Sequence, residues 1–183
     1  RNDVDKELVI NYCNNIKAQI EEQMYHRQDI RVHIDNRDLR GGDKMWGWVK
    51  SGVPIRVEIG LKDIEKSQVC VARRDMAVKD KAFVKVEDFV ANITHTLDDI
   101  QNNLLNRAKA FRDMHMYEAK SIKEFNKYFE DETNQENGFV ISYAIDDPII
   151  EDFIKPLKVT ARCIPIDSLD DIGVCIFTGG TNG

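Results

Sequence analysis

The chain has 183 residues, of which 42% are hydrophobic, and this is enough apolar material for one domain or two small ones. Its longest apolar runs are too short to span a bilayer, and no apolar stretch near the start is typical of a secretory signal. The four cysteines lack the spacing of a disulfide scaffold, which favours free thiols in a reducing compartment. We therefore expect a soluble, intracellular, folded chain.

The net charge of -6 conceals an asymmetry along the chain. Residues 1–85 hold 17 Lys and Arg against 14 Asp and Glu, whereas residues 86–183 hold 9 against 18. This polarity is typical of a basic working face beside an acidic support module. An ordinary solvated surface would give the same numbers, and charge alone leaves both interpretations open.

Hydrophobic periodicity predicts a layered α/β arrangement in the first 85 residues. A first helix opens at Asn2 or Asp3, and its apolar stripe continues to about Arg27. Strict alternation of apolar and polar residues predicts a half-buried strand over Ile30–Ile34. The following elements are a loop over 36–43, a short helix over 44–51, a strand over 53–59, a connection over 60–67, a strand over 68–73 and a polar turn over 75–81.

A long helix is expected to separate the two halves of the chain. Apolar residues recur every three or four positions from Phe89 to Phe111, so we expect Phe111 to be buried in a spine that both halves share. The last part predicts helices over 121–131 and 148–155 and strands over 138–145, 159–165 and 173–177. These elements divide the chain into a first domain over 1–85, a linking helix over 86–119 and a small domain over 120–183.

No arrangement of catalytic residues is visible in the sequence. The four histidines are scattered, the carboxylate pairs are adjacent residues that diverge on a helix, and the chain has no Walker loop, GxSxG or GxGxxG motif. The residues by themselves therefore favour a binding module over an enzyme active site.

The segment Gly42–Lys79 is the part of the chain richest in side chains that suit nucleic acid. Trp46 and Trp48 offer flat apolar surface, and alternation along the predicted strand directs Arg56 away from the core. Cations beside aromatic rings suit unpaired bases, because the rings stack and a guanidinium donates two parallel hydrogen bonds to guanine. By pattern alone the simpler interpretation is preferred, in which both tryptophans are core residues and Arg56 forms a surface ion pair with Glu58.

The string GVPIRVEIGLKDIEKSQVCVARRD, which begins at Gly52, resembles the anticodon-binding domain of class II prolyl-tRNA synthetases of the archaeal/eukaryotic type. The resemblance continues through Arg107–His115 to Arg162–Pro165, so it covers nearly the whole chain in two modules. It implies a mixed sheet flanked by helices that binds the anticodon loop of proline tRNA. A long linking helix and a small α+β C-terminal domain are expected to follow.

The resemblance also implies an anticodon site. Its residues are Met45, Arg56, Lys62, Arg74 and Lys79. Arg56 and Lys62 match residues that contact guanines and the backbone, Lys79 matches a basic residue after the RRD turn, and Met45 falls where the family often has a base-packing phenylalanine. The glutamate that follows the tryptophan in the family is Val49 here, so either one guanine is read differently or the register differs by one residue.

The C-terminal module of many relatives holds a structural zinc through four cysteines. The corresponding positions here are Ile145, Ile150, Cys175 and Thr178, and tetrahedral zinc needs a thiolate or an imidazole at each corner. The resemblance therefore implies that no zinc binds, with the two isoleucines packed where the metal stands in relatives.

The catalytic domain of the family would lie upstream of this sequence. The resemblance thus implies a C-terminal fragment of a proline–tRNA ligase that is inactive alone, with ATP and magnesium bound by the missing domain of a cytoplasmic homodimer. Its partner would be proline tRNA and neither DNA nor a membrane. The alternative is a free-standing anticodon-binding-like domain that serves as an accessory or interaction module without catalysis.

Overall fold

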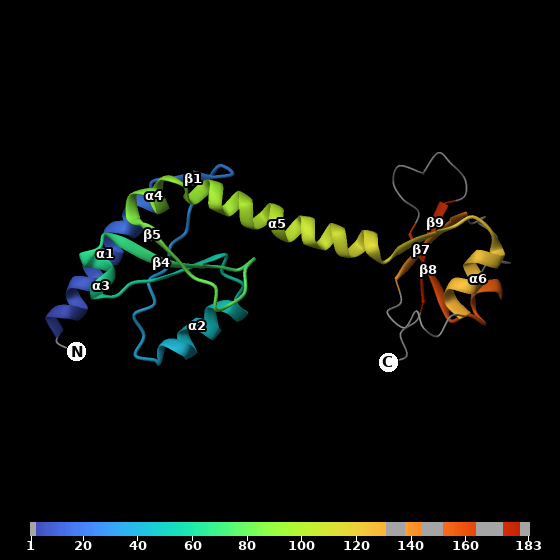
Figure 1. Cartoon of the computed structure of the whole chain (residues 1–183), viewed down its shortest axis with the longest axis horizontal. Coiled ribbons are helices and arrows are strands. Elements are labelled where there is room, and N and C mark those ends of the chain that lie inside the picture. Colours follow the sequence, from blue (N-terminus) through green and yellow to red (C-terminus); the bar gives the residue numbers. More distant parts are fainter. Residues whose placement is uncertain (1–2, 131–137, 144–151, 164–173, 180–183) are drawn as a thin grey trace. The chain divides into compact units, whose positions relative to one another are not determined.

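The computed structural model describes residues 3–130, 138–143, 152–163 and 174–179 (Figure 1). The chain divides into two compact units, Arg1–Asn106 (unit 1) and Arg107–Gly183 (unit 2). The stretch over 86–119, expected as a separate linking helix, is shared between these units. None of the described helices is long and apolar enough to cross a membrane.

Unit 1 combines helices with a three-stranded antiparallel sheet in which β4 is central. Its elements are α1 (Asp3–Glu21), β1 (Met24–Tyr25), β2 (Gln28–Asp29), α2 (Gly41–Lys50), β3 (Ile55–Glu58), α3 (Leu61–Glu65), β4 (Gln68–Arg73), β5 (Ala82–Lys85), α4 (Val86–Ala91) and the first part of α5 (Ile93–Met114). The α/β class expected from the sequence is confirmed.

The core of unit 1 lies between one face of this sheet and helices α1, α4 and α5. Val69 and Val71 of β4 pack with apolar side chains of the three helices, among them Ile16, Phe89 and Ile93. These residues are at most 6% exposed. Burial of this apolar surface provides the main driving force for folding of the unit.

Residues 30–34 keep the predicted alternation but form no strand pairing within the described part of the chain. Ile30 and Val32 pack against the core, while Arg31 and His33 are exposed. An extended segment that lies against the core therefore shows alternate burial even where it does not pair with another strand.

The first helix ends earlier than its apolar stripe predicted, at Glu21 instead of Arg27. His26 and Arg27 have φ values of 49° and 65°, in the left-handed region that a right-handed helix excludes. The chain turns here into the short hairpin β1–β2. Val4 and Leu8 are 68% and 51% exposed, so the first half of the stripe is not buried in the structure.

The long helix is interrupted and shorter than predicted. The helix α4 ends at Ala91, α5 ends at Met114, and a strand, β6 (Met116–Ala119), occupies the expected last turn. The expectation that Phe111 is buried is wrong, because the residue is 63% exposed, and its ring stacks on His115 with 4.1 Å between centroids. The buried positions of the stripe end at Ile100.

Unit 2 contains α6 (Ile122–Glu130) and a four-stranded sheet that also includes β7 (Phe139–Tyr143), β8 (Val159–Cys163) and β9 (Val174–Gly179). The strand order is β6-β7-β9-β8, with β6 and β7 parallel and the other pairs antiparallel. Its core gathers Phe125, Val140 and Phe177. The predicted zinc-equivalent positions Ile145 and Ile150, and the side chains of Cys175 and Thr178, lie outside the described residues.

Candidate nucleic-acid interface

The sheet of unit 1 has a second face that the core helices do not cover. In the strand register Arg56 lies opposite Ala72, Glu58 lies opposite Cys70, and Cys70 lies opposite Phe83. Because alternate residues of a strand share a face, these five side chains lie on the side opposite the core. We call this side the open face; Lys81 and Lys85, two residues on either side of Phe83, belong to it by the same alternation.

Arg56 is half-buried on the open face, and its side chain has no hydrogen bond or ion pair among the described residues. The simpler interpretation, an ion pair between Arg56 and Glu58, is wrong. The Glu58 carboxylate instead accepts from Lys81, with 2.6 Å between Oε2 and Nζ. The guanidinium of Arg56 therefore keeps its donors for a ligand. Val57, expected in the core, is 37% exposed because β3 lies at the edge of the described sheet.

Arg74 lies at the corner where α2 leads into β3. Its Nη1 donates to the carbonyl of Gly52 at 3.3 Å, and its backbone N–H donates to the carbonyl of Pro54 at 2.9 Å. Gly52 has a φ of 74°, a conformation that glycine adopts without strain. Arg74 remains exposed, so the donors that this contact does not use point to solvent.

Arg73 and Asp75 of the same RRD turn have a structural role. The Nε and Nη2 of Arg73 donate to the Asp75 carboxylate at 3.0 and 2.9 Å, and Asn103 Nδ2 donates to it at 2.8 Å. The hydrogen bond from Arg73 is the main cause that lowers the pKa of Asp75, whose side chain is fully buried. This network ties the end of β4 to α5 and removes Arg73 from the candidate interface.

Trp48 is held by Asp35, a residue that the sequence analysis did not single out. The Trp48 Nε1 donates to Asp35 Oδ2 at 2.8 Å, and Arg37 donates to both carboxylate oxygens at 2.9 and 2.7 Å. These bonds, with Arg37 as the largest contribution, hold the pKa of Asp35 far below its usual range. The Arg37 guanidinium lies 5.7 Å from the centre of the Trp48 ring. Since Trp48 is half-buried and Trp46 is 51% exposed, the prediction of two core tryptophans is wrong.

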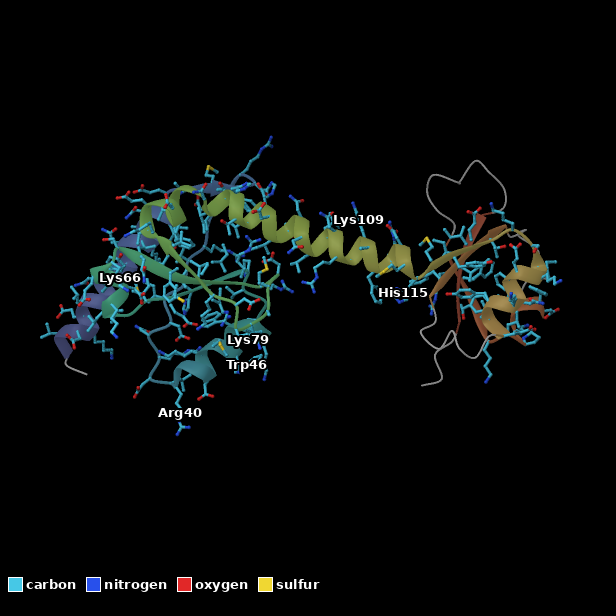
Figure 2. The ribbon with its side chains drawn as sticks, viewed as in Figure 1. Arg40, Trp46, Lys66, Lys79, Lys109 and His115 are labelled. Atoms are coloured by element: carbon cyan, nitrogen blue, oxygen red, sulfur yellow. The ribbon has the colours of Figure 1, made fainter. Side chains whose placement is uncertain are left out.

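The remaining predicted site residues lie on separate elements of unit 1. Met45 is half-buried on α2, Lys62 is exposed on the first turn of α3, and Lys79 is exposed in the connection between β4 and β5. Lys62 follows one end of β3, while Arg74 lies beside the Pro54 end, so the cations span the length of this strand. Figure 2 shows Lys79 and Trp46 in the part of unit 1 that surrounds α2.

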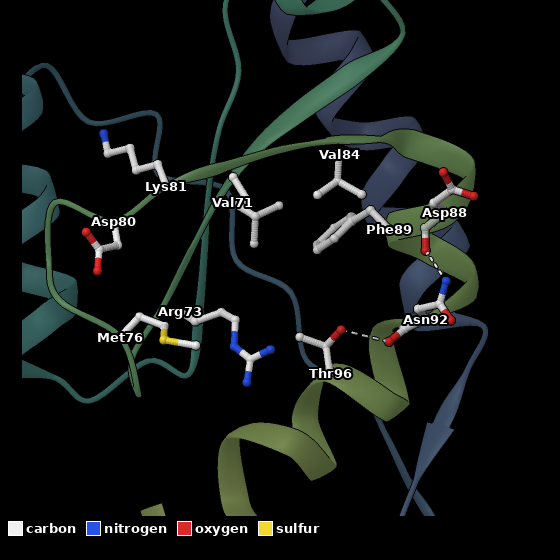
Figure 3. A pocket seen from close by; sticks show the side chains of 11 residues that line it. Val71, Arg73, Met76, Asp80, Lys81, Val84, Asp88, Phe89, Asn92 and Thr96 are labelled. Atoms are coloured by element: carbon white, nitrogen blue, oxygen red, sulfur yellow. Dashed lines mark hydrogen bonds between the residues drawn. The ribbon is translucent and has the colours of Figure 1, made fainter. Parts of the chain in front are cut away.

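A pocket of about 430 Å³ lies on the opposite, core-facing side, between β4, β5, α4 and α5 (Figure 3). Val71 and Phe89 form an apolar wall, and the lining cations Arg73 and Lys81 pair with Asp75 and Glu58. The carbonyl of Asn92 accepts from the Thr96 hydroxyl at 2.9 Å. Both lining cations therefore already have carboxylate partners, and this pocket is less suited to nucleic acid than the open face.

Comparison with known proteins identifies the class of this chain. Residues 5–96, about half of the chain, match the family described as anticodon binding domain, and the chain belongs to that family. It is 39% identical over 176 residues to a proline–tRNA ligase of Protochlamydia amoebophila, a match that covers 93% of this chain and 35% of that protein. It is also 39% identical over 179 residues to a proline–tRNA ligase of Bdellovibrio bacteriovorus, covering 98% of this chain and 36% of the relative.

A solved structure has the same fold. The crystal structure of prolyl-tRNA synthetase from Cryptosporidium parvum, in complex with L-proline and AMP, matches with a TM-score of 0.74 and 24% sequence identity. The match covers 93% of this chain and 36% of that chain. The chain therefore spans about a third of the length of the relatives it matches.

Proposed function

We propose that this chain recognises the anticodon of proline tRNA as part of a proline–tRNA ligase. Membership of the anticodon-binding family and the likeness to proline–tRNA ligases support this function. The observation that carries the proposal is the guanidinium of Arg56, which has no partner among the described residues and lies on the face of the sheet opposite the core.

In this proposal Arg56 reads one of the two guanines of proline anticodons. Its planar fork donates two parallel hydrogen bonds to guanine O6 and N7, which discriminates against other bases by about 1–3 kcal/mol. Lys62, Arg74 and Lys79 neutralise the backbone, since exposed cations on flexible stems suit phosphates. Met45 packs against a base. Val49 supplies no carboxylate, so the second guanine is read by other groups.

The rest of the proposal concerns the intact protein. The resemblance supports an archaeal/eukaryotic-type enzyme that activates proline with ATP and magnesium and attaches it to tRNA, in a cytoplasmic homodimer. The groups for that chemistry would lie outside this sequence, and the C-terminal module would fold without zinc. This chain would then supply recognition of the tRNA to the whole enzyme.

Substitution of Arg56 tests the proposed function. We expect Arg56→Ala to weaken binding of a proline anticodon stem-loop about tenfold and to relax discrimination at one guanine. Arg56→Lys should retain part of the affinity but lose discrimination, because an ammonium cannot make the paired contact. Arg112→Ala is the control, since that exposed arginine pairs with Asp113 in unit 2. Equal loss for every loop would make Arg56 a phosphate contact, and no loss would remove it from the interface.

A further inference from the structure

We propose that Phe83 is a stacking residue for a second nucleotide of the anticodon loop, one that flanks the guanine held by Arg56. The inference rests on the proposed function and extends it to a residue outside the predicted anticodon site. The partner is therefore an unpaired RNA nucleotide, recognised by its flat base and its phosphates.

The first support is the position of the Phe83 ring. The residue is 65% exposed, and its side chain lies on the same face of the sheet as Arg56, two strands away. Neighbouring strands are about 4.8 Å apart, so β3 and β5 are separated by about 10 Å, and Arg56 and Phe83 are also offset by two residues, or about 7 Å, along the strands. A short stretch of single-stranded RNA can reach across this distance and contact both side chains.

The second support is the small size of the side chains on β4, between β3 and β5. Cys70 and Ala72 of β4 are only 7% and 3% exposed, although the core helices pack on the other face. The ion pair between Glu58 and Lys81 spans β4 beside Cys70, and Glu58 contributes to the raised pKa of that thiol after burial itself. The open face therefore carries an aromatic ring on β5 and a guanidinium on β3, on either side of small β4 residues that are themselves nearly buried.

The third support is the charge that surrounds the ring. Lys81 and Lys85 flank Phe83 on the same face at two-residue spacing, which corresponds to about 7 Å on each side. Together with Arg56 they place three cations against one carboxylate, Glu58. The Nζ of Lys81 donates to Glu58 and the Nζ of Lys85 donates to the carbonyl of Lys66 at 2.7 Å, and each ammonium has further donors for a phosphate. A ring flanked by two such lysines suits a stacked base with phosphates on either side, as on the aromatic sheet surfaces of single-strand RNA-binding domains.

Lysines on an edge strand also discourage pairing with other chains, and this simpler role needs no RNA. The two roles predict different behaviour of the ring itself. If the lysines only protect the edge strand, the side chain at position 83 should not affect RNA binding. If Phe83 stacks on a base, RNA binding requires an aromatic side chain at that position.

The experiment compares Phe83→Ala, Phe83→Leu and Phe83→Trp with the wild-type chain in titrations of a proline anticodon stem-loop. A second stem-loop carries 2-aminopurine next to the guanines, because stacking on an aromatic ring quenches its fluorescence. Phe111→Ala is the matched control, since Phe111 is 63% exposed but lies on α5 in unit 2. Melting of each variant establishes that the exposed substitution leaves the fold intact.

We expect Phe83→Ala and Phe83→Leu to bind about 5- to 100-fold more weakly, Phe83→Trp to bind as the wild type, and Phe111→Ala to be unchanged. The wild-type chain should quench 2-aminopurine, and Phe83→Ala should not. Wild-type affinity of Phe83→Ala or Phe83→Leu, equal loss in Phe111→Ala, or unchanged quenching would each overturn the inference. The preference for the guanine-containing loop distinguishes the two proposals. If the wild type has this preference and Arg56→Ala removes it, one of these negative results at Phe83 refutes only the stacking role of Phe83. If the wild type has no such preference, the proposed function itself is refuted.

Discussion

The replacement of Asp75 by alanine is expected to destabilise unit 1 by about 3 kcal/mol, the lower end of the range for breaking a buried charge pair, because Asp99 stays 3.8 Å from the Arg73 guanidinium. The side chain is fully buried and accepts hydrogen bonds from Arg73 Nε, Arg73 Nη2 and Asn103 Nδ2 at 3.0, 2.9 and 2.8 Å. Its removal leaves the Arg73 guanidinium, only 25% exposed, without this carboxylate. For a unit of about 100 residues, such a loss lowers the melting temperature by about 10 °C or more.

The assay is thermal unfolding followed by tryptophan fluorescence, because Trp46 and Trp48 are the two tryptophans of the chain and both belong to unit 1. Asp80→Ala is the control, since Asp80 is an exposed aspartate in the same connection between β4 and β5. We expect the control to change the free energy of unfolding by less than about 0.5 kcal/mol. If Asp75→Ala melted with the control, the network would not hold β4 to α5.

The pH dependence of stability provides a second readout of Asp75. Its pKa is lowered in the folded state, chiefly by the hydrogen bond from Arg73, whereas the unfolded value is about 3.9. The stabilisation is therefore complete above the unfolded pKa and is lost as the pH falls through the lower folded pKa. The difference in stability between wild type and Asp75→Ala should shrink below about pH 4. A constant difference down to strong acid would contradict this role.

Three further predictions concern other parts of the chain. Phe111→Ala should change the free energy of unfolding by less than about 1 kcal/mol in circular dichroism melts, because the ring is exposed; a loss of several kcal/mol would show that it is buried. Lys79→Ala should weaken all stem-loops alike and reduce the salt dependence of binding by about one unit of slope, and a sequence-selective loss would assign it to a base. Metal analysis of the untagged protein should find no zinc, and one zinc per chain would refute this prediction.

The sequence predicted best where local pattern and burial agree. The strand over Gln68–Arg73 was predicted in full, because its apolar run is central in the sheet and buried on both faces. The strands β5 and β6 were missed, since they are short and largely exposed, with little apolar pattern. The end of α1 was missed because the positive φ values of His26 and Arg27 have no sequence signal comparable to glycine.

In the candidate site, too, local features could be predicted from the sequence, and contacts between distant residues could not. Alternation along one strand was sufficient to place Arg56 on the face opposite the core, because parity is a local property. The contacts of Trp48 with Asp35, and of Asp75 with Asn103, join residues 13 and 28 positions apart, and no periodic pattern connects them. The spacing Asp35-Asn36-Arg37 is a weak turn signal that could have indicated the first of these networks.

The most direct test of the central claim is an equilibrium titration of the wild-type chain with a proline anticodon stem-loop and with two counterparts, each lacking one of the two guanines. Anticodon recognition predicts the tightest binding to the unmodified loop and a loss of about 1–3 kcal/mol for each replaced guanine, at constant salt. Equal affinity for all three loops would contradict the account, because the open face would then bind RNA through its charge alone.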